Sequence, residues 1–205
     1  MKKTIGIYIY NQVEVLDFAG PFEVFSTATR LVSDKNEQGF DVFLIAETAD
    51  NGREVQARGG FPVQPHYSIH NHPPLHVLLV PGGVHDGEMS KSAVLSWMAA
   101  QHSTTQLTAS VCTGAFLLAQ ANILTSPHTT VTTHWDDING LRTQFPHLTV
   151  VEGQRWVDQG KIVTSAGISA GIDMALHLVS KLESLDLAER TARQMEFDWT
   201  KNASK

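Results

Sequence analysis

The chain changes from a strand pattern to a helix pattern within a few residues of its only cysteine, Cys112. The run of strand-forming residues over 106–112 is typical of a strand, and the pattern over 113–124 indicates a helix. Thr113 and Gly114 are small enough to let strand and helix pass closely, as in the G-x-S-x-G turn that raises a nucleophile above a sheet. A strand that passes so directly into a helix is typical of an α/β fold. This junction places the thiol at a helix amino end, where the dipole favours thiolate.

Strands and helices alternate along the rest of the chain. The predicted strands cover 4–10, 40–47, 76–83, 106–112, 129–135 and 148–153, with hairpins over 54–65 and 155–165. The predicted helices cover 17–33, 92–102 and 113–124, and two more lie between 169 and 199 with a break near 183–186. Asn51-Gly52 predicts a turn. The alternation predicts a mostly parallel sheet covered on both faces, and we expect residues 1–205 to form one domain.

Composition excludes several classes of protein. The chain has 15 Lys and Arg against 21 Asp and Glu, and it lacks a basic cluster, so we expect no nucleic-acid-binding surface. One cysteine cannot form an internal disulfide. No apolar stretch approaches the roughly 18 residues of a membrane span, and the amino-terminal run resembles a strand more than a signal peptide. These features predict a cytoplasmic protein without membrane contact.

Three predicted strand ends carry residues suited to catalysis. In an open α/β sheet ligands gather at the carboxyl ends of the strands, where Asp17, Gly82-Gly83 and Cys112 are expected to meet. Asp17 facing Cys112 would share a proton with the thiol and pass it to a substrate. The N–H groups of Gly82, Gly83 and Thr113 would stabilise charge on the attacked atom. The competing interpretations are a buried structural cysteine, an ordinary strand-ending turn, and an aspartate that caps a helix.

Five segments in this order resemble the ThiJ/PfpI superfamily: "LDFAGPFEVF", "LLVPGG", "SVCTGAFLLAQANIL", "TTHW" and "AGISAGIDMALHLV". The resemblance implies a flavodoxin-like three-layer α/β sandwich with a nucleophile elbow, a fold shared with class I glutamine amidotransferases. It is closest to the isonitrile hydratase branch and to the sensor domains of AraC-type regulators, because Asp17 replaces the usual glutamate and Cys112 precedes Thr113. The protease-like members have histidine directly after the cysteine, and the amidotransferases need a late His-x-Glu. Neither pattern is present.

The resemblance implies a hydratase for a small-molecule electrophile. Cys112 would attack the terminal carbon of an isonitrile to give a thioimidate, Asp17 would move the protons, and an N-substituted formamide would leave. Thr113 is carried over as the third catalytic residue, and His134, Gly167 and Ile168 as residues that shape the pocket. No metal or organic cofactor is implied, and a homodimer is expected.

Three other interpretations stay open. The first is a non-enzymatic ligand or redox sensor related to AraC-type regulators. The second is glyoxalase- or deglycase-type carbonyl chemistry at the same cysteine. The third is a zinc site in the histidine-rich loop, which contains His66, His70, His72 and His76 but no accompanying cluster of carboxylates or cysteines.

Overall fold

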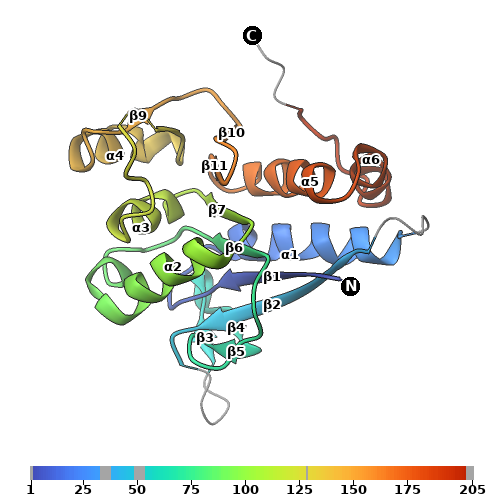
Figure 1. Cartoon of the computed structure of the whole chain (residues 1–205), viewed down its shortest axis with the longest axis horizontal. Helices are drawn as coiled ribbons and strands as arrows, with labels where there is room; N and C mark the ends of the chain where they lie inside the picture. Colours follow the sequence, from blue (N-terminus) through green and yellow to red (C-terminus); the bar gives the residue numbers. More distant parts are fainter. Residues whose placement is uncertain (1, 33–37, 49–53, 128, 202–205) are drawn as a thin grey trace.

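The computed structural model describes residues 2–32, 38–48, 54–127 and 129–201, so the predicted turn at Asn51-Gly52 lies outside the described residues. A seven-stranded sheet forms the centre, in the order β10-β11-β7-β6-β1-β2-β5 (Figure 1). Its strands are β1 (Lys3–Tyr8), β2 (Phe40–Ala46), β5 (Tyr67–Ser68), β6 (Val77–Val80), β7 (Leu107–Val111), β10 (Trp156–Asp158) and β11 (Ile162–Ser165). Neighbouring strands are parallel except β10, which runs antiparallel to β11.

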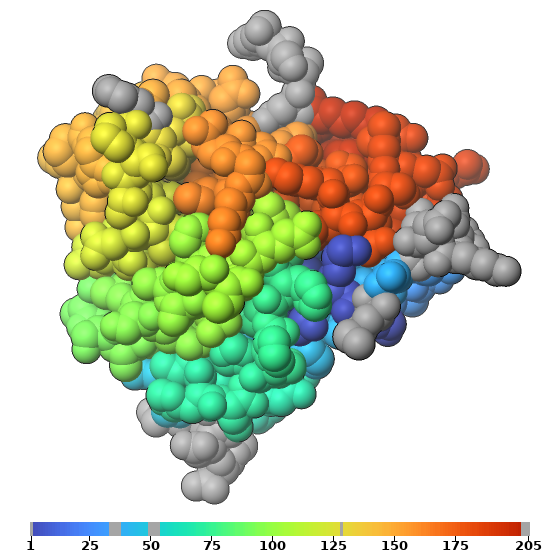
Figure 2. Space-filling model, viewed as in Figure 1, coloured from blue at the N-terminus to red at the C-terminus, as the bar shows by residue number. Residues whose placement is uncertain are grey.

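Helices cover both faces of this sheet. Helices α1 (Val15–Arg30), α5 (Ala170–Leu182) and α6 (Leu185–Gln194) pack against one another on one face. Helices α2 (Ser92–Thr104) and α3 (Gly114–Gln120) lie on the other (Figure 1). In the space-filling view little of the amino-terminal strand, coloured dark blue, reaches the surface on this side (Figure 2). The predicted α/β sandwich is therefore confirmed.

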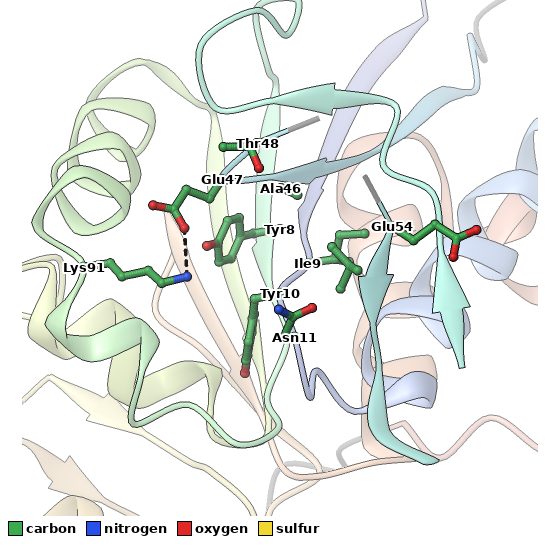
Figure 3. Close-up of a pocket in the computed structure, with 10 residues that line it drawn as sticks. Tyr8, Ile9, Tyr10, Asn11, Ala46, Glu47, Thr48, Glu54 and Lys91 are labelled. Atoms are coloured by element: carbon green, nitrogen blue, oxygen red, sulfur yellow. Dashed lines mark ion pairs between the residues drawn. The ribbon is translucent and has the colours of Figure 1, made fainter. Parts of the chain in front are cut away.

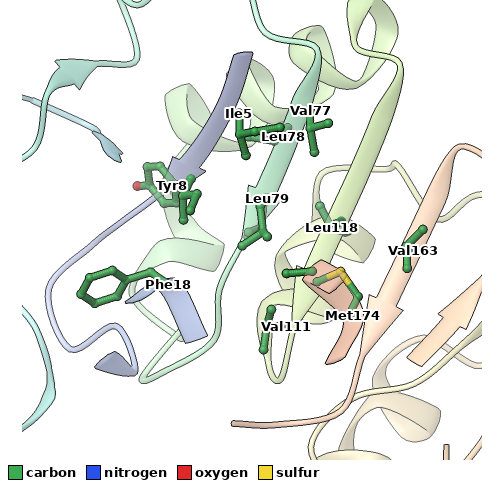
Figure 4. Close-up of a cluster of buried hydrophobic side chains, with 14 of the residues drawn as sticks. Ile5, Tyr8, Phe18, Val77, Leu78, Leu79, Val111, Leu118, Val163 and Met174 are labelled. Atoms are coloured by element: carbon green, nitrogen blue, oxygen red, sulfur yellow. The ribbon is translucent and has the colours of Figure 1, made fainter. Parts of the chain in front are cut away.

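The central strands are apolar because both of their faces are covered. Every residue of β6 and β7 is buried, as expected for parallel strands between two helical layers. Side chains from strands and helices meet in one core, among them Leu79, Val111, Leu118 and Met174 (Figure 4). None of the helices within the described residues is both long enough and apolar enough to span a bilayer.

Both predicted hairpins are present. Strands β3 (Val55–Gln56) and β4 (Pro62–Val63) pair antiparallel across a turn in which Gly59 and Gly60 adopt positive φ values of 71° and 78°. Strands β10 and β11 are joined through Gly160, whose φ is 83°. Glycine adopts this left-handed backbone without the steric cost that a Cβ imposes. The predicted break between the last two helices is also present, because α5 ends at Leu182 and α6 begins at Leu185.

The third quarter of the chain is less β-like than its sequence indicates. The predicted strands 129–135 and 148–153 shorten to β8 (Thr130–Val131) and β9 (Thr149–Val150), and α4 (Ile138–Gln144) lies between them. Side-chain hydrogen bonds are the reason. Thr132 Oγ1 donates to a main-chain carbonyl at 2.9 Å, and Thr133 Oγ1 donates to the carbonyl of Cys112 at 2.8 Å. The threonines that suggested a strand thus anchor a loop beside the end of β7.

Candidate active site

Cys112 occupies a strained turn between β7 and α3. Its φ of 56° is in the left-handed region that residues with a Cβ rarely adopt, and its N–H donates to the carbonyl of Ser165 at 3.1 Å. A Cβ at Gly114 would collide with the carbonyl oxygen of Val80, so only glycine lets the turn approach β6 this closely. The geometry is that of a nucleophile elbow, as predicted from the residues around the cysteine.

Asp17 lies fully buried in the first turn of α1, where it does not cap its own helix. Its Oδ2 accepts a hydrogen bond from the Gly82 N–H at 3.0 Å. Its Oδ1 is buried without a partner of ordinary hydrogen-bond geometry among the described residues. Burial raises the pKa of Asp17 to about 7, with a further rise from Glu14, while the Gly82 N–H and the Cys112 thiol lower it. The carboxyl is therefore ready to accept or donate a proton near neutral pH.

The surroundings of Cys112 raise the pKa of its thiol, whereas a helix amino end was expected to favour the thiolate. Burial raises its pKa, and the neighbouring Asp17 carboxylate raises it further. The Thr113 N–H has the opposite effect but does not offset them. Helix α3 spans only seven residues, so its dipole is weak against the cost of burying a charge. A nucleophilic role for Cys112 would therefore require transfer of the thiol proton to a nearby base.

Thr113 holds the glycine turn against the elbow. Its Oγ1 accepts from the Gly83 N–H at 3.0 Å and donates to the Gly83 carbonyl at 3.1 Å. The Gly82 N–H is also occupied, because it donates to Asp17. In this arrangement neither glycine N–H is free to stabilise charge on a substrate atom, which corrects the expectation from the sequence. Of the three predicted donors, the Thr113 N–H is directed at the sulfur instead.

His134, Gly167 and Ile168 lie beside Cys112. A Cβ added at Gly167 would collide with the His134 ring and would lie 3.0 Å from Cys112 Sγ, so the glycine leaves room for both. The Nδ1 atom of His134 accepts from the Asp136 N–H at 3.4 Å. Ile168 is 37% exposed and lines the cavity in front of the thiol. The structure thus brings the residues singled out in the sequence to one place.

The cavity in front of Cys112 has a volume of about 530 Å³. Sequence reasoning did not select most of its charged lining, which consists of Glu14, Arg58, His85, Asp86, Asp136 and Asp137. Local signals for several of them were present. Asp136 and Asp137 directly follow the "THW" segment, and His85 and Asp86 follow the glycine turn within three residues.

A second cavity, of about 240 Å³, lies at the carboxyl ends of β1 and β2 (Figure 3). Its Lys91 ammonium lies 2.8 Å from a Glu47 oxygen and 2.7 Å from a Glu88 oxygen, and Tyr8 donates to Glu88 at 2.6 Å. These groups satisfy one another, and the described lining contains neither cysteine nor histidine. The Cys112 cavity is therefore the candidate active site.

The histidine-rich loop uses its rings within the fold. His66 and His76 each accept from a main-chain N–H at 3.0 Å through Nδ1, and His72 Nε2 accepts from the Trp97 indole at 2.8 Å. Across the described ranges, no three or more His, Cys, Asp or Glu side chains are grouped so that they could hold a metal ion. The zinc alternative gains no support from this loop.

Comparisons of the sequence and of the structure with known proteins match the same group of relatives. The profile of the DJ-1/PfpI family matches residues 3–181. The isonitrile hydratase of Pseudomonas putida is 29% identical over 96% of this chain and 79% of the hydratase. The HTH-type transcriptional regulator GbdR of Pseudomonas aeruginosa is 23% identical over 98% of this chain but only 52% of the regulator, so the chain spans about half of that relative. A ThiJ/PfpI family protein from Pseudomonas syringae superposes with a TM-score of 0.82 at 25% identity, over 100% of this chain and 78% of that one.

Proposed function

Because this chain belongs to the DJ-1/PfpI family, we propose that it is a cysteine-dependent hydratase that converts a small isonitrile into an N-substituted formamide. The observation that carries the proposal is the buried Asp17 carboxyl, whose pKa of about 7 suits proton transfer with the Cys112 thiol at neutral pH. The 29% identity to the Pseudomonas putida isonitrile hydratase supports the same chemistry.

The first half of the reaction forms a covalent intermediate. Asp17 accepts the proton of Cys112, and Sγ bonds to the terminal carbon of the isonitrile R–N≡C. Asp17 then returns the proton to that carbon. The product is the neutral thioimidate R–N=CH–S–Cys112. Its formation needs no oxidant, metal or cofactor.

The second half consumes water. Water adds to the thioimidate carbon while one of its protons passes to the nitrogen, giving R–NH–CH(OH)–S–Cys112. The carbon–sulfur bond then breaks, the hydroxyl proton returns to sulfur through Asp17, and R–NH–CHO leaves. The balance is R–N≡C plus water to R–NH–CHO, with thiol and carboxyl restored.

The remaining site residues take supporting roles in this proposal. The Thr113 N–H stabilises negative charge on the sulfur, and the Thr113 hydroxyl is a positioning group that fixes the Gly83 peptide. Gly82 holds the Asp17 carboxylate through its N–H. His134, Gly167 and Ile168 shape the space that the substituent R occupies.

Turnover of a small isonitrile tests the proposal. Loss of the isonitrile stretch in the infrared and appearance of the formyl proton by NMR would be followed for the native sequence, Cys112→Ser and Asp17→Asn. Asp41→Asn is the matched control, since Asp41 is an exposed residue near the amino end of β2. We expect turnover in the native protein and the control only. A native protein without turnover, although its thiol reacts with alkylating reagents, would refute the hydratase.

A ligand sensor is the second candidate, because the alignment with GbdR covers 98% of this chain. A sensor would bind a small molecule at the Cys112 cavity and leave it unchanged. Saturable binding of an isonitrile or a carbonyl compound without product formation would favour the sensor.

Turnover of a dicarbonyl such as glyoxal would instead favour carbonyl chemistry at the same thiol.

A further inference from the structure

The wall of the Cys112 cavity is strongly acidic. Glu14, Asp86, Asp136 and Asp137 all line it. Within its described lining, Arg58 is the one side chain with a permanent positive charge, and it lies 3.6 Å from a Glu14 carboxylate oxygen. His85 and His134 also line the cavity, and His134 Nδ1 lies 3.4 Å from an Asp137 carboxylate oxygen. The four carboxylates outnumber Arg58 and the two imidazoles together, so the lining carries an excess of negative charge.

These carboxylates face a reactive centre and not an ordinary stretch of surface. Cys112 interacts with Asp17, whose Oδ1 is buried and without a hydrogen-bond partner of ordinary geometry among the described residues. Asp137 and Glu14 both contribute to raising the pKa of the Cys112 thiol, so their field reaches the sulfur. A negative group carried by a substrate would meet the same field.

The mouth of the cavity also presents apolar surface. Val84 and Ile168 line it with 48% and 37% of their surface exposed. Trp135 is 77% exposed, and its ring lies 5.6 Å from that of His134, a lining residue. A substituent on the substrate would therefore contact hydrocarbon at the entrance and carboxylates along the wall.

We propose that the cavity selects electrophiles whose hydrocarbon substituent is uncharged or carries a cationic group, and that it discriminates against substituents bearing a carboxylate or sulfonate. A fixed negative charge would have to enter a partly enclosed space among like charges, whereas a cation would be attracted there. The inference names the substrate class of the proposed hydratase and so rests on that function. The charge selection itself can be measured without turnover, from the rates at which charged reagents modify the Cys112 thiol.

Labelling of Cys112 with charged thiol reagents tests the selection. Trimethylammonioethyl, hydroxyethyl and sulfonatoethyl methanethiosulfonate are similar in size, and each forms a disulfide with Sγ and releases methanesulfinate. The rate of each reagent on the folded protein is divided by its rate on the urea-unfolded protein, which removes intrinsic reactivity. The cation-to-anion ratio is the normalised rate of the trimethylammonioethyl reagent divided by that of the sulfonatoethyl reagent. We expect this ratio to be about ten or more at low salt and to fall toward one at high salt.

Charge-removing variants assign the effect to the wall. The double variant Glu14→Gln, Asp137→Asn removes the two wall carboxylates that raise the pKa of the thiol and should lower the ratio severalfold, whereas Arg58→Gln should raise it. Asp41→Asn removes one carboxylate near the amino end of the sheet, so it should leave the ratio unchanged. A folded protein with a ratio of one, or variants that leave the ratio untouched, would overturn the inference.

Turnover separates this inference from the function on which it rests. Matched isonitriles carrying an ammonium, a hydroxyl or a carboxylate should show kcat/KM falling in that order. Cation-selective labelling with no isonitrile turnover would refute the hydratase and leave the charge selection standing. Equal kcat/KM for the ammonium and carboxylate substrates would overturn the selection and leave the hydratase standing.

Discussion

The Asp17 carboxyl and the Cys112 thiol lie buried at the carboxyl end of the sheet, where each shifts the pKa of the other. The charge of Asp17 raises the pKa of the thiol, and the thiol in turn lowers the pKa of Asp17. Above a pH of about 7 the negative charge resides on Asp17, where the Gly82 N–H stabilises it. In the proposed reaction Asp17 is therefore the base that generates the Cys112 thiolate.

The first prediction concerns stability. Folding raises the pKa of Asp17 from 3.8 to about 7, so the native state holds this proton more tightly than the unfolded chain. Native stability therefore falls as pH rises from about 4 to about 7 and stays low above that. Asn is neutral and keeps an acceptor for the Gly82 N–H. We expect the free energy of unfolding of Asp17→Asn, measured by urea denaturation, to exceed that of the native sequence by up to about 4 kcal/mol at pH 8. The difference should be smaller at pH 5.

The control for this prediction is Asp41→Asn, an exposed surface change near the opposite edge of the sheet. Its stability should follow that of the native sequence at both pH values. An Asp17→Asn protein that is less stable than the native one at pH 8 would contradict the raised pKa of the buried carboxyl.

The second prediction concerns the thiol. Asp17→Asn removes a negative charge that raises the pKa of Cys112, whereas the effect of burial remains. The pH profile of alkylation by iodoacetamide should then move to lower pH in Asp17→Asn, although isonitrile turnover is lost. Mass spectrometry of the modified Cys112 peptide measures the rates. A profile that moves to higher pH would show that Asp17 activates the thiol toward every electrophile and does not merely raise its pKa.

Much of the fold follows from local sequence. The alternation of apolar strands with helices gave the parallel sheet, and the glycines at 59–60 and 160 marked two hairpins because each occupies a left-handed backbone conformation. The candidate site followed from one topological rule. Parallel strands end at the same edge, so Asp17 and Cys112 had to come near each other once β1 and β7 were assigned to one sheet.

What the sequence could not supply depends on contacts between distant segments. The Gly82 and Gly83 N–H groups are occupied only because Asp17 and Thr113 approach them from other elements. The raised pKa of Cys112 comes chiefly from burial, a property of the assembled core rather than of the elbow. The carboxylates of the cavity wall lie on loops whose course a strand-and-helix pattern leaves open.

The third prediction concerns the elbow. Gly114→Ala would place a methyl group well inside van der Waals contact with the carbonyl oxygen of Val80. That oxygen is a backbone atom, so the clash can be relieved only by moving the backbone. We expect a loss of about 3 kcal/mol or more, or failure to fold. Gly87→Ala is the matched control, because nothing lies within 4 Å of a Cβ there. Thermal unfolding of the two variants side by side decides the matter, and equal melting temperatures would show that the elbow can relax.

The last prediction separates the hydroxyl of Thr113 from its backbone. Thr113→Val keeps the shape but removes both hydrogen bonds to Gly83, leaving a partly buried N–H and carbonyl without that partner. Thr113→Ser keeps the hydroxyl and loses only a methyl group. We expect Val to lose about 1–3 kcal/mol of stability and to lower kcat for isonitrile hydration, and Ser to retain most of both. If the hydroxyl instead donated a proton to the substrate, Val would lose activity at native stability. Urea unfolding and kinetics on the same preparations distinguish the two roles.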